Sequence, residues 1–279
     1  MEHRLNYLVI RGEKEKRIYI NEINTIIVQS TAVSLTASLL CELIRSGVKV
    51  IFCDEKNNPQ SELLPYYGAH NTSKRYKNQI RWADDVKKKV WKAVIKQKIF
   101  NQAEYLSERG FPSQAELLKS YCEQVTDGDE TNREGHAAKV YFNCLMPENV
   151  SRDSGGFING CLNYGYAVLL SAFNREIVAC GYLTQLGIWH DNEFNQFNLA
   201  SDLMEPFRVV ADRTAFSLED GDAEFKKKMA GIMNYKTVTD GKNTTLDLAV
   251  RQYVKSAIYA LESGDVQDLV FPTEIIYNE

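Results

Sequence analysis

The hydrophobic pattern of the sequence changes near residue 70, and this change sets the limits on the fold. Before it, short β-prone runs are separated by turn signals, at residues 5–10, 16–20, 24–29, 48–54 and 61–67. After it, apolar residues recur over long segments with the helical spacing of about 3.6 residues. The sequence therefore predicts an α+β fold, with a small β-rich domain over residues 1–72 and a larger all-helical domain over residues 73–279.

One predicted helix interrupts the β-prone region. Residues 34–47 have a Ser or Thr start, leucines at helical spacing and Gly47 as a stop. The N-terminal domain is therefore expected to be a sandwich or roll that contains this helix. In the C-terminal domain, helices are expected at residues 73–108, 113–124, 132–145, 158–180, 198–216, 223–233 and 244–262.

Several classes of protein are excluded by what the sequence lacks. It has no run of about 18 apolar residues, so a membrane span is not expected. The first residues show no small-residue cleavage site, so secretion is not expected either. The six cysteines form no C-x-x-C pair, which argues against a sulfur-ligated zinc site. We interpret them as reduced thiols of a cytoplasmic protein.

Charge is distributed unevenly along the chain. The net charge is −4, yet residues 74–98 contain ten basic residues and two acids, a net of +8 that leaves −12 for the rest. A local basic segment on an acidic body is typical of a protein that binds a polyanion, such as nucleic acid, at one place. A solvated helix face is the alternative for such a run, and charge alone leaves both open.

Two carboxylates lie inside an apolar helical pattern. Asp202 and Glu205, three residues apart, share one helix face. Two like charges on a half-buried face repel each other unless a cation or a basic partner compensates them, and Arg208 is the structural alternative to a bound cation. Pro206 lacks a backbone donor, so the helix is expected to loosen or kink beside Glu205.

Glu134 and His190 are candidates from two other segments. Glu134 opens a predicted helix that Asp129 or Thr131 can cap, and acids are common there because they favour the positive end of the helix dipole. The small residues that follow it allow close packing, which would bring Glu134 towards the interior. His190 comes after an apolar run and begins a polar loop, where a lone histidine is more often part of a structural hydrogen bond.

Together these candidates have the ligand types of a divalent-metal site. Glu134, His190 and Glu205 supply oxygen, nitrogen and oxygen, a set that suits Mg²⁺ or Mn²⁺, with Mn²⁺ better able to accept the imidazole. A structural zinc site would use thiolates or more histidines. The spacing between the three matches no short metal motif, so the chemistry alone indicates the site only weakly.

Three sequence signatures occur in one order along the chain: "NREGHAAKVYF", "FINGCLNYGYAVLLSAFNREIVACGY" and "GIWHDNEFNQFNLASDLMEPFRVVAD". With the β-rich start, they resemble the CRISPR-associated integrase and endonuclease of spacer acquisition, the first-numbered CRISPR-associated protein. The resemblance covers essentially the whole chain. It is closest to the version found in type II systems, because of the compact length, "LNYGYAVLL" and "DLMEPFR".

The resemblance implies roles for the site residues. The family's ligands for a catalytic Mg²⁺ or Mn²⁺ fall on Glu134, His190 and Glu205, although several branches have aspartate at the third position. Asp202 falls on a nearby acid that helps to shape the site. It either binds the metal itself or orients His190 by accepting the proton on the other ring nitrogen, and we favour the second role.

The "LNYGY" signature adds two further residues. Asn163 and Tyr164 fall in it, and in the family it lies against the active site. For Tyr166, core packing between helices is an equal alternative.

The resemblance also implies a reaction. A 3′-hydroxyl of the new spacer attacks a phosphodiester at the edge of a CRISPR repeat, so the nucleophile comes from the DNA and the enzyme needs no Ser, Tyr or Cys nucleophile.

The implied partners are double-stranded DNA, as prespacer and as CRISPR repeat, and a second copy of the chain paired through the N-terminal domain. The others are the second-numbered CRISPR-associated protein in a 4:2 complex and other type II CRISPR proteins. We assign the phosphate contact to Lys74, Arg75, Lys77 and Arg81, called the basic ridge below. The following "KKKVWKAVIKQK" is the part for which a solvated helix face stays open.

Two other functions remain as alternatives. One is a non-catalytic DNA-binding scaffold. A degenerate paralogue is expected to lose at least one of the three ligands, so the presence of all three argues against it. The other is a stand-alone nuclease of branched DNA with the same fold, which gene neighbourhood would distinguish from spacer acquisition.

Overall fold

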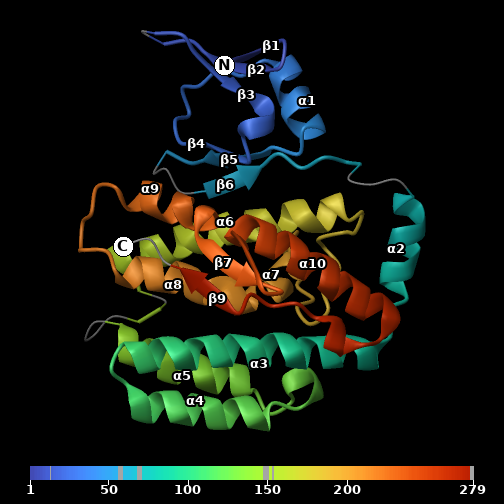
Figure 1. Ribbon diagram of the computed structural model, residues 1–279, viewed down its shortest axis with the longest axis vertical. Helices are drawn as coiled ribbons and strands as arrows, with labels where there is room; N and C mark the ends of the chain where they lie inside the picture. The colour runs from blue at the N-terminus through green and yellow to red at the C-terminus, as the bar shows by residue number, and fades with distance from the viewer. Residues whose placement is uncertain (13, 56–58, 68–70, 147–150, 153, 277–279) are drawn as a thin grey trace. The chain divides into compact units, whose positions relative to one another are not determined.

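The computed structural model describes residues 1–12, 14–55, 59–67, 71–146, 151–152 and 154–276. The chain divides into two compact units, Met1–Gly68 and Ala69–Glu279. Strands dominate the first unit and helices the second (Figure 1), so the predicted α+β class is confirmed.

The first unit contains two small sheets. One is antiparallel and consists of β1 (Glu2–Arg4), β2 (Tyr7–Ile10) and β3 (Lys16–Tyr19). The other consists of β4 (Thr25–Val28), β5 (Lys49–Cys53) and β6 (Pro59–Glu62). In this sheet β4 and β5 run parallel, which requires a crossover, whereas β6 runs antiparallel to β5.

The crossover between β4 and β5 is the predicted helix. It is α1 (Ala37–Arg45), and it begins where the Thr36 hydroxyl accepts a hydrogen bond from the Leu39 backbone N–H. Leu39 and Leu43 on its inner face are buried in one core with residues from both sheets, including Leu8 and Val50. Burial of this shared core holds the two sheets and the helix together.

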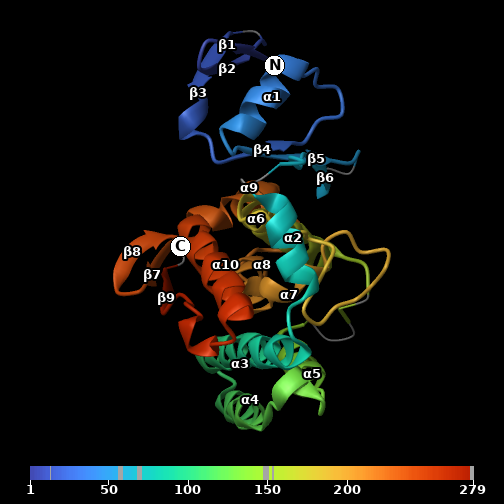
Figure 2. The ribbon, with the colours of Figure 1, turned by 90° about the vertical axis from the view of Figure 1, so that its right-hand side faces the viewer.

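The second unit is built mainly from helices. They are α2 (Thr72–Ile80), α3 (Asp84–Glu108), α4 (Pro112–Gln124), α5 (Arg133–Leu145), α6 (Phe157–Ala179), α7 (Asn198–Leu203), α8 (Arg208–Phe216), α9 (Phe225–Ala230) and α10 (Leu246–Ser263). Short 3₁₀ turns lie between them: η2 (Asp127–Asp129), η3 (Glu205–Phe207), η4 (Gly231–Asn234) and η5 (Val266–Asp268). Figures 1 and 2 show α3 and α4 side by side, and α3 also packs against α5, α8 and η3.

Helix α6 approaches α8 closely because of one glycine. A Cβ atom on Gly165 would lie 2.8 Å from Ala211 Cβ and 2.3 Å from Met229 Cε. The methionine end can shift, but the alanine Cβ is fixed to its backbone. This close contact places the α6 residues that follow Gly165 directly beside α8.

The predicted break beside Glu205 is confirmed. Helix α7 ends at Leu203, and α8 begins at Arg208. Between them lies η3, with Pro206 inside it. Pro206 has no N–H for the helical ladder, so the single segment predicted over residues 198–216 is two helices joined by a turn.

The prediction that the second unit is entirely helical is wrong. It also holds an antiparallel sheet, in the order β8–β7–β9, formed by β7 (Lys236–Thr239), β8 (Lys242–Thr245) and β9 (Glu274–Ile276). Asp240 and Gly241 make the turn between β7 and β8, with φ angles of 51° and 69°. Asp-Gly is a strong hairpin signal, but the strands beside it are short and polar, so hydrophobic alternation did not reveal them.

All six cysteines are free thiols. Burial raises the pKa of Cys161 to about 11, so this thiol stays protonated and unreactive at neutral pH. In the described part of the chain, no helix has the length and apolarity needed to cross a bilayer.

Candidate active site

Glu134 is held at the start of α5 by two acceptor side chains. Asn132, with φ of 50°, accepts a hydrogen bond from the Gly135 N–H. Asp129 accepts from the backbone N–H groups of Arg133 and Glu134, both at 2.9 Å. The predicted cap at Asp129 is therefore present, whereas Asn132 is the N-cap in place of Thr131. These hydrogen bonds fix the first turn of α5 and therefore the backbone position from which the Glu134 side chain extends.

Glu205 is buried in the turn between α7 and α8, with only 3% of its surface exposed. Arg208 Nε donates to Glu205 Oε1 at 2.9 Å, as the sequence allowed. Asn101 on α3 donates to the Pro206 carbonyl at 2.8 Å and so anchors the turn against α3. The break in the helix is thus fixed in place by a hydrogen bond from another element.

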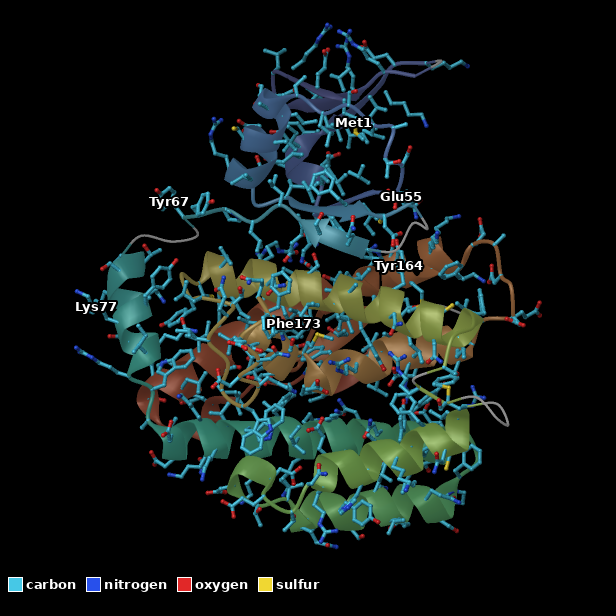
Figure 3. All side chains as sticks on the ribbon, turned by 180° about the vertical axis from the view of Figure 1, so that it is seen from behind. Met1, Glu55, Tyr67, Lys77, Tyr164 and Phe173 are labelled. Atoms are coloured by element: carbon cyan, nitrogen blue, oxygen red, sulfur yellow. The ribbon has the colours of Figure 1, made fainter. Side chains whose placement is uncertain are left out.

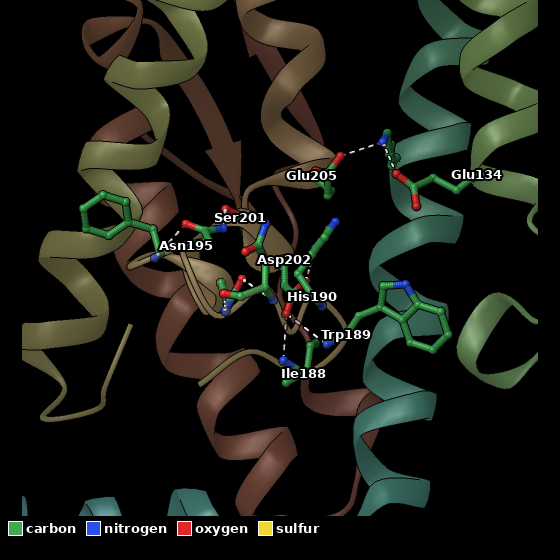
Figure 4. Close-up of polar contacts among 12 residues, drawn as sticks. Glu134, Ile188, Trp189, His190, Asn195, Ser201, Asp202 and Glu205 are labelled. Carbon is green, nitrogen blue, oxygen red and sulfur yellow. Dashed lines mark hydrogen bonds and ion pairs between the residues drawn. The ribbon is translucent and has the colours of Figure 1, made fainter. Parts of the chain in front are cut away.

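Lys98 on α3 lies between the two glutamates, and sequence reasoning missed it. Its Nζ is 2.6 Å from Glu134 Oε1 and 2.6 Å from Glu205 Oε2 (Figure 4). Burial acts to lower the pKa of Lys98, but the two carboxylates outweigh it and raise the pKa above its usual value. Burial acts to raise the pKa of Glu205, yet Lys98 and Arg208 lower it to about 2. Lys98 and Glu205 are therefore charged at neutral pH.

Asp202 is fully buried and holds the loop that carries His190. Its Oδ2 accepts from the backbone N–H groups of Ile188 and Trp189, at 2.7 and 3.0 Å. Its Oδ1 accepts from the His190 N–H at 3.1 Å and lies 2.5 Å from the ring Nδ1 (Figure 4). This hydrogen bond raises the pKa of His190, although burial acts the other way. With Nδ1 engaged by Asp202, Nε2 is the ring nitrogen left to contact a ligand.

The turn into His190 requires a glycine. A Cβ atom on Gly187 would lie 2.3 Å from the His190 carbonyl oxygen and 2.7 Å from Asp202 Oδ2. The His190 and Trp91 rings pack at 89° to each other with their centres 5.7 Å apart, and Trp189 stacks on the same tryptophan. Helix α3 therefore packs against the loop through Trp91, and hydrogen bonds hold the loop to Asp202.

A cavity of about 610 Å³ opens beside Lys98. Its lining includes both glutamates, and also Arg152, Tyr166 and Arg208. The guanidinium groups of Arg152 and Arg208 lie 5.3 and 4.6 Å from the centre of the Tyr166 ring. The cavity therefore combines an acidic pair with two arginines, a composition that suits a bound cation next to a bound anion.

The residues of the "LNYGY" signature are placed differently from one another. Asn163 lines the cavity and accepts a hydrogen bond from Arg152 at 2.6 Å. Tyr164 is buried beside Phe225 and does not line the cavity. Tyr166 lines the cavity instead. The sequence signature places Tyr164 against the site and leaves core packing open for Tyr166, but the geometry has the two tyrosines the other way round.

Tyr166 belongs to a buried network with Asp212. Asp212 accepts hydrogen bonds from the hydroxyls of Tyr166 and Tyr141, at 2.5 and 3.0 Å. Burial raises the pKa of Asp212 to about 6 in spite of these two hydrogen bonds. The sequence carried no separate signal for this carboxylate, because one acid in an apolar helical pattern has many explanations.

The proposed metal ligands do not form a ready coordination shell. Among the described residues, no three of His, Cys, Asp and Glu lie close enough to hold a metal ion. Glu134 and Glu205 converge, but on the ammonium group of Lys98, and His190 lies outside the cavity lining. The donor types still fit Mg²⁺ or Mn²⁺, because two carboxylates already meet one cation and the imidazole is held through its other nitrogen.

The basic segment divides into two parts. In the first, Lys74, Lys77 and Arg81 are exposed and form no ion pair with any described residue, and Figure 3 shows Lys77 extending outward from α2. Arg75 instead lies over the Tyr182 ring, 5.4 Å from its centre. In the second part, ion pairs engage the surface lysines of α3: Lys87–Asp84, Lys88–Glu130, Lys89–Asp85, Lys92–Asp127 and Lys96–Glu123.

The chain is similar to known proteins over most of its length. The sequence model of the family described as CRISPR associated protein Cas1 matches residues 2–237. The CRISPR-associated endonuclease Cas1 of Neisseria meningitidis serogroup C (strain 8013) is 36% identical over 276 residues, which cover 96% of this chain and 91% of that protein.

Two solved structures share the fold. A casposase bound to an integration product aligns with a TM-score of 0.75 and 22% identity, over 91% of this chain and 83% of that one. A Cas6-RT-Cas1–Cas2 complex aligns with a TM-score of 0.73 and 17% identity, over 95% of this chain and 34% of that one. At these identities the two structures establish a shared architecture and nothing about chemistry.

Proposed function

This chain belongs to the Cas1 family of CRISPR-associated proteins, and from that premise we propose that it is a divalent-metal-dependent DNA integrase and endonuclease that inserts new spacers into a CRISPR array. The observation that carries the proposal is the convergence of Glu134 and Glu205, from separate elements, on one cation. Arg152 and Arg208 line the same cavity. Phosphodiester transfer needs both a cation and donors that face the phosphate oxygens.

In this proposal each side chain has a defined task. Glu134, Glu205 and Nε2 of His190 hold Mg²⁺ or Mn²⁺, and Asp202 fixes the imidazole ring. When bound, the ion polarises the phosphodiester and stabilises charge on the attacking and leaving oxygens. Arg208 keeps Glu205 ionised and contributes positive charge to the wall that the phosphate meets.

The nucleophile is the 3′-hydroxyl of the incoming DNA. Its oxygen loses its proton to solvent and forms a bond to phosphorus at the repeat edge. The bond from phosphorus to the 3′-oxygen of the cut strand breaks, and that leaving oxygen takes up a proton. The tyrosines near the cavity support this assignment, because the hydroxyls of Tyr141 and Tyr166 donate hydrogen bonds to Asp212. Burial holds both pKa values well above the usual value, so neither hydroxyl is an activated nucleophile.

A strand-transfer assay tests the function. A prespacer-like duplex is incubated with a supercoiled plasmid that carries a CRISPR repeat, in Mn²⁺, in Mg²⁺ or in EDTA. We expect joined products with either ion and none in EDTA or with 3′-dideoxy ends. Joining in EDTA would contradict the metal requirement, nicking without joining would favour a branched-DNA nuclease, and DNA binding without either reaction would favour a scaffold.

The proposed partners are duplex DNA, a second copy of the chain and Cas2, in a 4:2 complex, together with other type II CRISPR proteins. Support comes from the two structural neighbours, of which one is bound to an integration product and one is a Cas1–Cas2 assembly. Exposed Leu5, Tyr7 and Ile18 in the first unit supply apolar surface for the homodimer. A monomeric mass of the intact chain in light scattering would contradict the homodimer. The proposed location is the cytoplasm, where the DNA is.

The basic ridge should bind DNA through phosphates. Replacing Lys74, Arg75, Lys77 and Arg81 with glutamine is expected to weaken duplex binding to a similar degree for unrelated sequences, because phosphate contacts carry no base information. Each lost contact should flatten the log–log dependence of affinity on salt by about 0.9. Fluorescence anisotropy with several duplexes, each titrated at several salt concentrations, measures both effects.

The paired lysines of α3 provide a matched control for the basic ridge. Replacing Lys88, Lys89, Lys92 and Lys96 with glutamine removes the same charge, but from side chains that already meet an acid. This variant should retain most of the wild-type salt dependence. Equal losses in the two variants, or a loss restricted to particular sequences, would contradict the assignment of the basic ridge.

A further inference from the structure

Lys98 differs from every other lysine of α3. The other five form ion pairs with surface acids, at 2.9 to 3.8 Å. Lys98 is 92% buried, since only 8% of its surface is exposed, and it lies on the apolar stripe of the helix beside Ile95 and Ile99. Its ammonium group reaches the two carboxylates that the proposed function assigns to the metal. A buried charge of this kind is costly unless it is fully compensated.

The two carboxylates need a cation between them. Glu134 Oε1 and Glu205 Oε2 each lie 2.6 Å from the same Nζ atom, so the two oxygens are at most twice that distance apart. Two carboxylates this close, one buried and one partly exposed, repel each other. The Oε2 atom of Glu205 lies 2.6 Å from Lys98 Nζ, whereas Oε1 accepts from Arg208, so Lys98 is the positive group at Oε2.

We infer that Lys98 is a placeholder for the divalent cation: its ammonium group neutralises Glu134 and Glu205 in the metal-free protein and moves to a DNA phosphate when both carboxylates bind the ion. The inference rests on the proposed function. A divalent ion binds such oxygens at about 2.1 Å, and no space for it remains between them while Nζ is there. The lysine therefore has to leave, and its flexible four-carbon stem permits this.

The cavity provides the new position for the ammonium group. Lys98 lines it together with Arg152 and Arg208. A phosphate that enters this cavity meets positive charge from the arginines and adds an acceptor for Lys98. The lysine thus exchanges two carboxylates for a phosphate without losing ionic contact, which limits the cost of moving a buried charge.

This exchange makes metal binding and DNA binding interdependent. A phosphate that attracts Lys98 frees the carboxylates and raises the affinity for the ion. By thermodynamic linkage the ion raises the affinity for DNA by the same factor, and such couplings are typically about 5- to 150-fold. Wild-type protein should therefore bind Mn²⁺ weakly alone and more tightly when a duplex is present.

The test measures Mn²⁺ binding by electron paramagnetic resonance of the free ion, with the full-length chain and without any reaction. Lys98→Met should bind Mn²⁺ about 5- to 150-fold more tightly than wild type in the absence of DNA. A duplex with 3′-dideoxy ends should raise the affinity of wild type and change that of Lys98→Met much less. Lys92→Met is the matched control, since Lys92 lies on the same helix and pairs with Asp127 instead, and it should behave as wild type.

Thermal melting provides a second readout. Without the ammonium group the two carboxylates lose the cation between them, and Arg208 still pairs with Glu205 but does not pair with Glu134. Lys98→Met should therefore melt below wild type in EDTA and recover in Mn²⁺. Equal destabilisation in both buffers, or a Mn²⁺ affinity no higher than that of wild type, overturns the placeholder role. If Lys98→Met does not fold in either buffer, Lys98→Arg is measured in its place. The planar guanidinium group keeps a cation on both carboxylates and should weaken Mn²⁺ binding relative to wild type. A wild-type affinity for Mn²⁺ in Lys98→Arg would overturn the placeholder role.

The outcomes separate the inference from the proposed function. If wild type binds Mn²⁺ as tightly as Lys98→Met, the metal-dependent function stands and the placeholder role fails. If neither protein binds Mn²⁺, with or without DNA, both fail.

Discussion

Strand transfer should fall to background in each of three variants: Glu134→Gln, His190→Ala and Glu205→Gln. Each removes one of the three groups assigned to the metal, and glutamine keeps the shape of a glutamate without its charge. Duplex binding in EDTA should remain, because the basic ridge lies on another element. The variants should nevertheless differ in stability. Glu205 is buried between Lys98 and Arg208, and removing one partner of such a group costs about 3–5 kcal/mol, whereas Glu134 is partly exposed.

The three variants are compared by gel-based strand transfer, anisotropy with duplex DNA and thermal melting. Glu130→Gln is the control for Glu134→Gln, because Glu130 is an exposed acid just before α5 that pairs with Lys88 and does not line the cavity. It should keep wild-type activity. Full strand transfer in any of the three variants would remove that residue from the metal site, and loss of duplex binding together with activity would point to misfolding.

The second large effect is expected at the His190 loop. In Gly187→Ala, the new Cβ would meet the His190 carbonyl oxygen at 2.3 Å and Asp202 Oδ2 at 2.7 Å. Both belong to the arrangement that orients the imidazole, so the loop has to move. A displacement of about 1 Å at a catalytic group costs on the order of 100-fold in rate. Gly160→Ala is the control, because Gly160 lies inside α6 with nothing within 4 Å of a new Cβ.

Asp202→Asn addresses the same loop through its acceptor. One of the two oxygens becomes an NH₂ group that faces N–H donors, which loosens the loop without removing a ligand. We expect a loss of about 10- to 100-fold, as is typical for groups that orient a metal ligand. Added Mn²⁺ should restore part of the activity in both Asp202→Asn and Gly187→Ala, measured as strand transfer across a Mn²⁺ titration. Inactivity of Asp202→Asn at every concentration would mean that Asp202 binds the ion itself.

The sequence predicted those parts of the site where a residue is unusual for the helical pattern around it. Pro206 inside an apolar helix predicted the turn at Glu205, because a missing N–H acts on its own neighbours whatever the rest of the fold does. The paired acids Asp202 and Glu205 predicted a compensating positive charge for the same local reason. The sequence pattern did not show that the two acids have different partners. Asp202 contacts His190, whereas Glu205 contacts Lys98.

Lys98 was hidden by its neighbours in the chain. It was counted as one member of a basic segment, and charge totals do not distinguish the faces of a helix. Its helical spacing from Trp91 and Ile95 places it on the buried stripe of α3, and that spacing was the available signal. The sheet of the second unit was missed for the opposite reason, because Asp240-Gly241 marked a turn but its short polar strands carried no apolar pattern.

The wide separation of the site along the chain has a consequence during synthesis. Lys98 and Glu205 are 205 − 98 = 107 residues apart, and Glu134 comes from a third element between them. The contact between Lys98 and Glu205 cannot form on the ribosome until the turn after α7 has emerged and folded back onto α3. A growing or prematurely ended chain that stops before this turn has the lysine and one glutamate but no acidic pair. Under the proposed function such a chain lacks the carboxylate pair for the metal, so DNA cleavage is expected only after this turn has folded onto α3.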